Sequence, residues 1–87
     1  MTVFYVLQNW KDYDLRKRRS GMDPRFFDCL QNWEIEFLVT RIQHIYTFIP
    51  ESLIRKAITK ACDKETVNKE RENFVSIVLE YLAIPVN

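Results

Sequence analysis

The sequence predicts a mainly α-helical fold, a small three-helix bundle with an N-terminal extended arm or short strand. One glycine and three prolines leave few turn-forming residues, which favours a few helices over many short strands. Residues 30–49 have a clear helical period, and two further segments with apolar stripes follow after short links. Hydrophobic residues make up 47% and charged residues 29%, a balance typical of folded domains. At a length of 87 residues we expect a single domain, residues 1–87.

Residues 1–10 are predicted to form the arm or short strand, because their first part is rich in β-branched and aromatic residues. The apolar residues of this segment also fit one face of a helix, so both conformations stay open. A strand needs a partner for its backbone groups. That partner is either the strand-like run Arg25–Cys29, which gives an α+β fold with a minor two-stranded hairpin, or the same strand of a second chain.

Residues 11–22 are predicted to form a basic loop. They contain four adjacent cations followed by a Ser-Gly pair. Because like charges this close repel one another, we expect a solvated and mobile connector. The four cations are Arg16, Lys17, Arg18 and Arg19.

The first predicted helix spans residues 24–49. It begins at the Asp23-Pro24 pair or at Asp28, both of which suit a helix N-terminus, and Pro50 ends it. This helix has two apolar faces where a surface helix needs one, so it is either sandwiched or half of an interface. The first face contains Ile35, Leu38, Val39, Ile42, Ile45, Tyr46 and Ile49, and the second contains Leu30, Trp33, Phe37 and Phe48.

Two more helices are predicted at residues 51–62 and 64–83. The short link at Pro50 indicates that the helix at 51–62 folds back antiparallel onto the first face of the central helix. The helix at 64–83 has an apolar stripe opposite a polar face, and it ends before Pro85. The outer side of the helix at 51–62 is basic, with Arg55, Lys56 and Lys60 continuing to Lys64.

The two cysteines, Cys29 and Cys62, are predicted to be reduced. On antiparallel helices with these bounds they are offset by about 10 Å, whereas a disulfide needs Cα atoms within roughly 7 Å. The longest apolar run is far too short for a signal-peptide core or a membrane span. We therefore expect a cytoplasmic protein without membrane contact.

No pattern of catalytic or metal-binding residues is found in the sequence. One histidine and two widely separated cysteines do not form a metal cluster, and there is no glycine-rich phosphate loop. The small size also leaves little room for a pocket. We expect no enzymatic activity, no catalytic residue, no metal, no cofactor and no small-molecule substrate.

The function that fits these observations best is a protein-interaction module that binds itself or another protein. Its interface would be the second apolar face of the central helix, since tryptophan and phenylalanine are frequent interface anchors. The alternative is that residues 3–10 cover this face within the same chain. The interface residues are Leu30, Trp33, Phe37 and Phe48.

A second hypothesis is a small nucleic-acid-binding protein. The formal net charge of +1 supports at most non-specific phosphate contacts from two local basic groups, the loop and the helix at 51–62. The residues expected to contact phosphates are Arg16, Lys17, Arg18, Arg19, Arg55, Lys56, Lys60 and Lys64.

Overall fold

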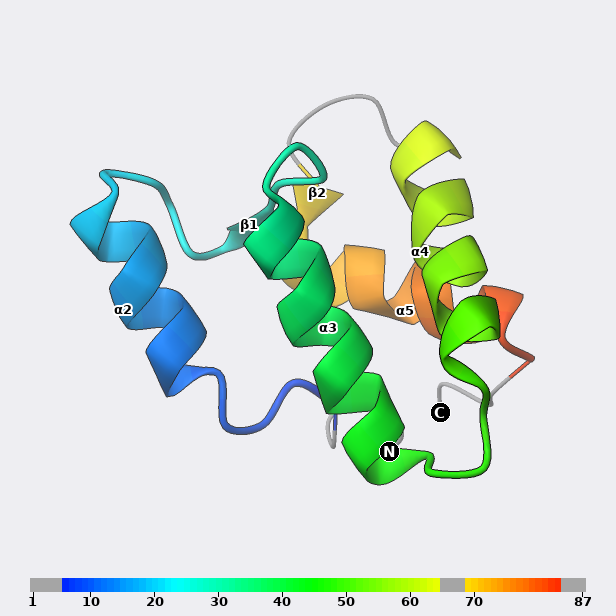
Figure 1. Cartoon of the computed structure of the whole chain (residues 1–87). Coiled ribbons are helices and arrows are strands. Elements are labelled where there is room, and N and C mark those ends of the chain that lie inside the picture. Colours follow the sequence, from blue (N-terminus) through cyan, green and yellow to red (C-terminus); the bar gives the residue numbers. More distant parts are fainter. Residues whose placement is uncertain (1–5, 65–68, 84–87) are drawn as a thin grey trace.

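The structure, a computed structural model, describes residues 6–64 and 69–83. In chain order the elements are α2 (Lys11–Arg19), β1 (Phe26–Phe27), α3 (Asn32–Ile45), α4 (Glu51–Lys64), β2 (Lys69–Glu70) and α5 (Arg71–Tyr81). Helix α3 lies between α2 and α4, and α5 crosses behind them (Figure 1). The mainly α-helical class is therefore confirmed. None of the described helices is long and apolar enough to cross a membrane.

The core lies where α3, α4 and α5 meet, and α4 packs against both of the other helices. Its side chains come from the apolar faces that the helical periods predict, and each large one contributes about 1.5–3 kcal/mol when fully buried. Phe27 of β1 stacks on Phe74 of α5 with ring centroids 4.4 Å apart, so β1 packs against the same core. The buried apolar residues that α3, α4 and α5 contribute are Leu38, Val39, Ile42, Ile54, Ala57, Ile58, Ala61, Phe74, Val75, Val78 and Leu79.

The prediction of a basic loop at residues 11–22 was wrong, because most of this segment is helix α2. Its acidic residues, Asp12 and Asp14, lie in the first turn, and its four cations lie in the last turn. Negative charge near a helix N-terminus and positive charge near the C-terminus both interact favourably with the helix dipole. The order of the charges therefore favours a helix, and their mutual repulsion is further relieved because Lys17 is buried against an anion.

The helix predicted at 24–49 is shorter at both ends. Phe26–Phe27 form β1, which pairs antiparallel with β2 in the register Phe26 to Glu70 and Phe27 to Lys69. The strand-like run thus forms a strand, but its partner comes from the segment before α5. Residues 46–49 form a turn after α3, with the N–H of Ile49 donating to the carbonyl of Tyr46.

The remaining bounds agree in part. Helix α4 covers the predicted 51–62 and continues to Lys64. Of the helix predicted at 64–83, residues 65–68 lie outside the described residues and α5 begins only at Arg71. Of the predicted arm, residues 1–5 also lie outside the described residues. Residues 7–10 form turns and bends that lead into α2, so no strand occurs in that described part.

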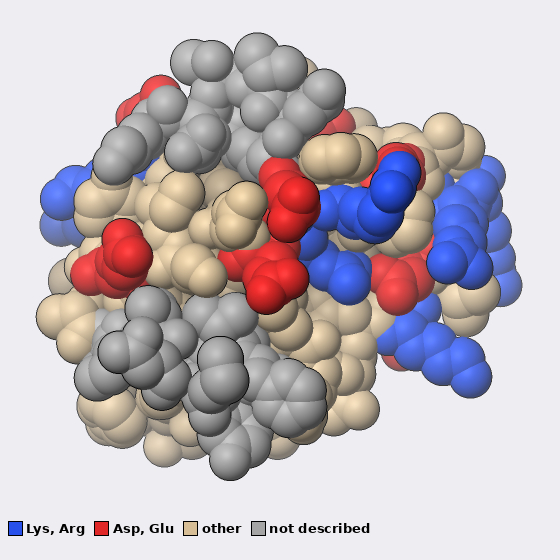
Figure 2. Space-filling model, turned by 180° about the vertical axis from the view of Figure 1, so that it is seen from behind, with Lys and Arg blue, Asp and Glu red and all other residues tan. Residues whose placement is uncertain are grey.

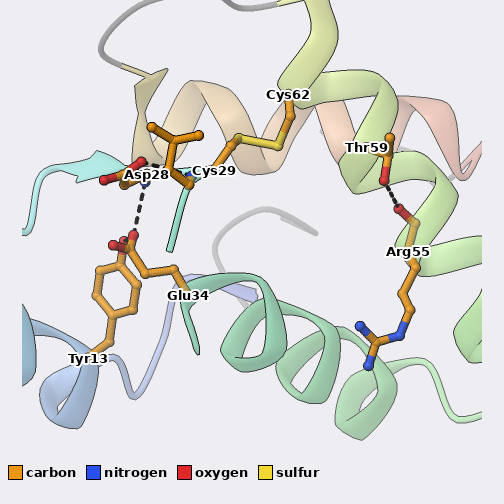
Figure 3. The surroundings of a disulfide bond; sticks show 8 residues. Tyr13, Asp28, Cys29, Glu34, Arg55, Thr59 and Cys62 are labelled. Atoms are coloured by element: carbon orange, nitrogen blue, oxygen red, sulfur yellow. Dashed lines mark hydrogen bonds between the residues drawn. A yellow bond between two sulfur atoms is a disulfide. The ribbon is translucent and has the colours of Figure 1, made fainter. Parts of the chain in front are cut away.

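Cys29 and Cys62 form a disulfide with a Cα–Cα distance of 6.0 Å, so the prediction of two reduced thiols was wrong. The predicted offset assumed that Cys29 lies inside the central helix. Instead, α3 begins at Asn32, and Cys29 lies in the turn before it. Two antiparallel helices of equal length bring this turn beside the last turn of α4, where Cys62 lies (Figure 3).

Candidate functional site

A buried ion pair between Lys17 and Glu34 joins α2 to the start of α3. The ammonium of Lys17 lies 3.0 and 3.1 Å from the two carboxylate oxygens of Glu34, and it also donates to the carbonyl of Phe26 at 2.5 Å. The hydroxyl of Tyr13 donates to Oε1 of Glu34 at 2.6 Å, and the backbone N–H of Asp28 donates to the same oxygen at 2.9 Å. Figure 3 shows the hydroxyl of Tyr13 and the backbone N–H of Asp28 directed at the carboxylate of Glu34. Both charged side chains are buried, with 1% of Lys17 and none of Glu34 exposed.

This arrangement, named here the Glu34 cluster, holds α2 in place. All three protons of the Lys17 ammonium have acceptors, and Glu34 accepts from three donors. Such full pairing makes the burial of two charges tolerable. The sequence spacing could have predicted two members of the cluster, because Tyr13 and Lys17 are four residues apart and so share one face of a helix. Nothing in it identifies Glu34 as their partner.

Burial raises the pKa of Tyr13 above its ordinary value of 10.0, and the hydrogen bond to Glu34 raises it further. The folded chain therefore keeps this proton in a pH range where the unfolded chain loses it. The resulting stability is fully present below about pH 10 and falls as the pH rises further, by up to about 1.4 kcal/mol per pH unit. Urea unfolding at pH values from about 9 to 11 should show a steeper loss for the native chain than for Tyr13→Phe, which keeps the ring. Equal slopes for the two proteins would contradict this assignment.

The four residues of the predicted interface do not form one surface. The guanidinium of Arg16 lies 4.3 Å from the centre of the Trp33 ring, and the ring of Trp10 lies 4.9 Å from that of Phe37. Trp33 and Phe37 are therefore half-buried inside the chain. Trp10, from the segment expected to cover this face, contacts Phe37, whereas Trp33 is covered by Arg16 of α2, outside that segment. Leu30 and Phe48 lie at opposite ends of α3 and are 92% and 80% exposed.

The predicted phosphate-contacting residues are also divided. Lys17 is buried inside the molecule, whereas Arg16, Arg18 and Arg19 are exposed on α2. Arg55 is paired with two carboxylates, Glu36 at 2.6 Å and Glu51 at 2.7 Å, and its hydrogen bonds hold the pKa of Glu36 below the ordinary 4.5. Lys56 and Lys60 are exposed on α4, across α3 from α2 (Figure 1). The side chain of Lys64 lies outside the described part. Seen from behind, most of the visible Lys and Arg side chains gather toward one side of the molecule (Figure 2).

An apolar hollow of about 630 Å³ lies between the α3–α4 link, α4 and the end of α5. We call it the Phe48 groove. Beside Phe48, two more large apolar side chains are partly exposed there, Leu53 at 48% and Tyr81 at 41%. Its lining residues are Tyr46, Phe48, Ile49, Pro50, Leu53, Lys56, Ala57, Lys60, Tyr81, Leu82 and Ala83.

A second hollow, the α2–α3 cleft, has a volume of about 730 Å³ and lies between α3 and residues 9–16. The chain therefore offers more space for a ligand than its length led us to expect. The cleft combines two aromatic rings with amide, hydroxyl and charged groups. Its lining residues are Asn9, Asp12, Arg16, Asn32, Trp33, Glu36, Phe37, Thr40, Arg41 and His44.

Comparison with protein-family models, with curated proteins and with solved structures finds no match to this chain. Within residues 6–64 and 69–83, no group of three or more His, Cys, Asp and Glu side chains is arranged to hold a metal ion. The functional assignment therefore rests on the Phe48 groove and the α2–α3 cleft themselves.

Proposed function

We propose that this chain is a small protein-interaction domain and that its binding surface is the Phe48 groove. Single exposed apolar residues are common on protein surfaces, but here Phe48, Leu53 and Tyr81 surround one hollow. A continuous apolar surface of this kind marks an interaction site. The exposure of Phe48 is the observation that carries the proposal, because a phenylalanine at the turn after α3 gains nothing from contact with water.

The charges around the groove favour a partner segment that is both apolar and acidic. Lys56 and Lys60 lie along the groove, and its lining contains no carboxylate among the described residues. Complementary charge attracts such a segment and fixes its orientation, while the apolar contacts supply most of the affinity. A second copy of the chain fits less well, since a two-fold contact would bring the lysines of the two grooves together. The proposed occupant is therefore an acidic amphipathic helix of another protein.

A fluorescein-labelled peptide of about 15 residues, with leucines on one helical face and glutamates on the other, tests this proposal by fluorescence anisotropy. We expect Phe48→Ser to weaken binding by at least about tenfold, as at an interface anchor. Leu30→Ser is the matched control, because it removes another highly exposed apolar side chain at the opposite end of α3. Equal affinities of the two variants would overturn the groove as the site.

Light scattering on the same proteins distinguishes a second copy from a separate partner. The proposal expects a monomer of 10.5 kDa at all loading concentrations. A dimer that Phe48→Ser dissociates and Leu30→Ser does not would replace the acidic partner with self-association through the same groove.

We also propose that the interaction takes place in an oxidising compartment, in place of the cytoplasm expected from the sequence. The support is the Cys29–Cys62 disulfide. Disulfides form and persist in oxidising surroundings and are rare in the cytosol, where thiols are kept reduced.

A further inference from the structure

The α2–α3 cleft exists because α2 and α3 are joined through long side chains. The ring and hydroxyl of Tyr13 and the extended chain of Lys17 reach from α2 to Glu34, and all three are buried. Helices that pack through small residues lie close together, whereas these two are held apart by an aromatic ring and a lysine. The cleft beside this spacer is therefore a fixed feature of the fold.

One wall of the cleft is a single face of α3. Trp33, Phe37, Thr40 and His44 recur at helical spacing, so the wall extends for about 16 Å at 1.5 Å per residue. Trp33 and Phe37 are half-buried, and the ring of Phe37 packs on that of Trp10 with centroids 4.9 Å apart. The wall thus offers a firm aromatic surface at one end and polar groups at the other.

Arg16 gives the cleft an oriented cation. Its guanidinium stacks over the ring of Trp33 at 4.3 Å, and it takes part in none of the salt bridges found within the described residues. Stacking on an aromatic ring fixes the plane of a guanidinium but leaves the N–H groups at its edge able to donate. Two parallel N–H groups match the two oxygens of a carboxylate.

The carboxylates of the lining do not cancel this cation. Glu36 is already paired with Arg55, which holds both of its oxygens at 2.6 and 2.8 Å. Asp12 lies one turn before Arg16 on α2 and is exposed, and it forms no salt bridge with Arg16. An exposed carboxylate in water screens its neighbour only weakly.

We propose that the α2–α3 cleft binds a small aromatic carboxylate, with Arg16 holding the carboxylate and the edges of Trp33 and Phe37 contacting the ring. The volume of about 730 Å³ lies within the usual range for small-molecule sites. This site is separate from the Phe48 groove, so it adds a second binding activity to the proposed interaction domain.

Titration of ¹⁵N-labelled protein with indole-3-acetate, followed by NMR, tests the proposal. We expect saturable shifts of the Trp33 indole N–H and the Arg16 Nε–H, with a dissociation constant of about 0.1–1 mM. Indole-3-acetamide has the same shape without the charge, and we expect it to bind at least about tenfold more weakly. Arg16→Gln should weaken indole-3-acetate binding by a similar factor.

Arg18→Gln is the matched control, because Arg18 is an exposed arginine on the same helix that does not line the cleft. Arg16→Lys separates charge from stacking, and we expect an intermediate affinity since lysine lacks the planar fork. Equal affinities for acid and amide, equal effects of Arg16→Gln and Arg18→Gln, or shifts confined to the Phe48 groove would each overturn the proposal. So would the absence of saturable shifts up to about 10 mM ligand.

Discussion

Replacing Glu34 by glutamine is expected to lower the free energy of unfolding by about 3–5 kcal/mol, the cost of leaving a buried charge without its partner. The ammonium of Lys17 would remain enclosed, with the carbonyl of Phe26 as its strongest remaining acceptor. Glutamine keeps the shape of the side chain, so the loss reports the charge and not a cavity. Urea unfolding followed by circular dichroism measures the effect.

Glu36→Gln is the matched control for this prediction. Glu36 lies two residues further along α3 and is also paired with a cation, but both members of that pair are substantially exposed. Exposed pairs contribute at most about 1 kcal/mol, so this variant should stay close to the native chain. If Glu34→Gln and Glu36→Gln lower the free energy of unfolding equally, water has access to the Glu34 cluster. The cluster would then not stabilise the fold as a buried ion pair.

The elements that the sequence predicts well are those defined by their own periodicity. Helix α4 has a regular apolar stripe and a proline directly before it, so both its start and its buried face follow from local rules. The inward face of α3 is equally regular, with Leu38, Val39 and Ile42 buried as expected. These local patterns were sufficient to predict the mainly α-helical class.

The elements that the sequence predicts poorly depend on residues far away in the chain. Phe26–Phe27 become a strand because Lys69–Glu70 lie beside them, and no local pattern reports that pairing. The basic run was interpreted as a loop because its repulsion is visible in the sequence, whereas the carboxylate that receives Lys17 is 17 residues further on. A local sequence pattern shows how many charges a segment has, but not which distant residues they pair with.

The candidate sites follow the same division. The sequence leaves Trp33 and Phe37 as either interface anchors or residues covered by the N-terminal segment. In the structure Trp10 of that segment contacts Phe37, and Arg16 covers Trp33 from α2, which was expected to be a loop. The Phe48 groove joins the end of α3 to the end of α5, more than 30 residues away in sequence. Only the contribution of Phe48 was predicted. Both hollows require the packing of helices whose relative placement no single segment encodes.

Reduction of the Cys29–Cys62 disulfide is expected to lower the free energy of unfolding by about 3–4 kcal/mol. The bond closes a loop with a sequence separation of 33 residues, and a cross-link of this span removes a corresponding amount of conformational entropy from the unfolded chain. Urea unfolding with and without dithiothreitol measures the difference. The double variant Cys29→Ala, Cys62→Ala should match the reduced chain and should no longer respond to the reductant.

The protein is alkylated in its source compartment and analysed by mass spectrometry to check whether the bond is present there. The reagent labels Cys29 and Cys62 only if they are reduced. Unlabelled cysteines in the intact protein are the expected result. Complete alkylation would contradict the proposed oxidising compartment. An unchanged urea unfolding transition in dithiothreitol would contradict the stabilising role of the disulfide.

The disulfide and the Glu34 cluster are expected to act together, because they share the turn before α3. Cys29 follows Asp28, whose backbone N–H donates to Glu34 (Figure 3). Neighbouring groups that share a partner give non-additive losses of stability. Reduction frees the turn to move, so it should weaken the hydrogen bond from Asp28 to Glu34. We therefore expect reduction to lower the free energy of unfolding of Glu34→Gln by less than that of the native chain. Equal losses in both proteins would mean that the turn stays in place without the bond, held by the pairing of β1 with β2.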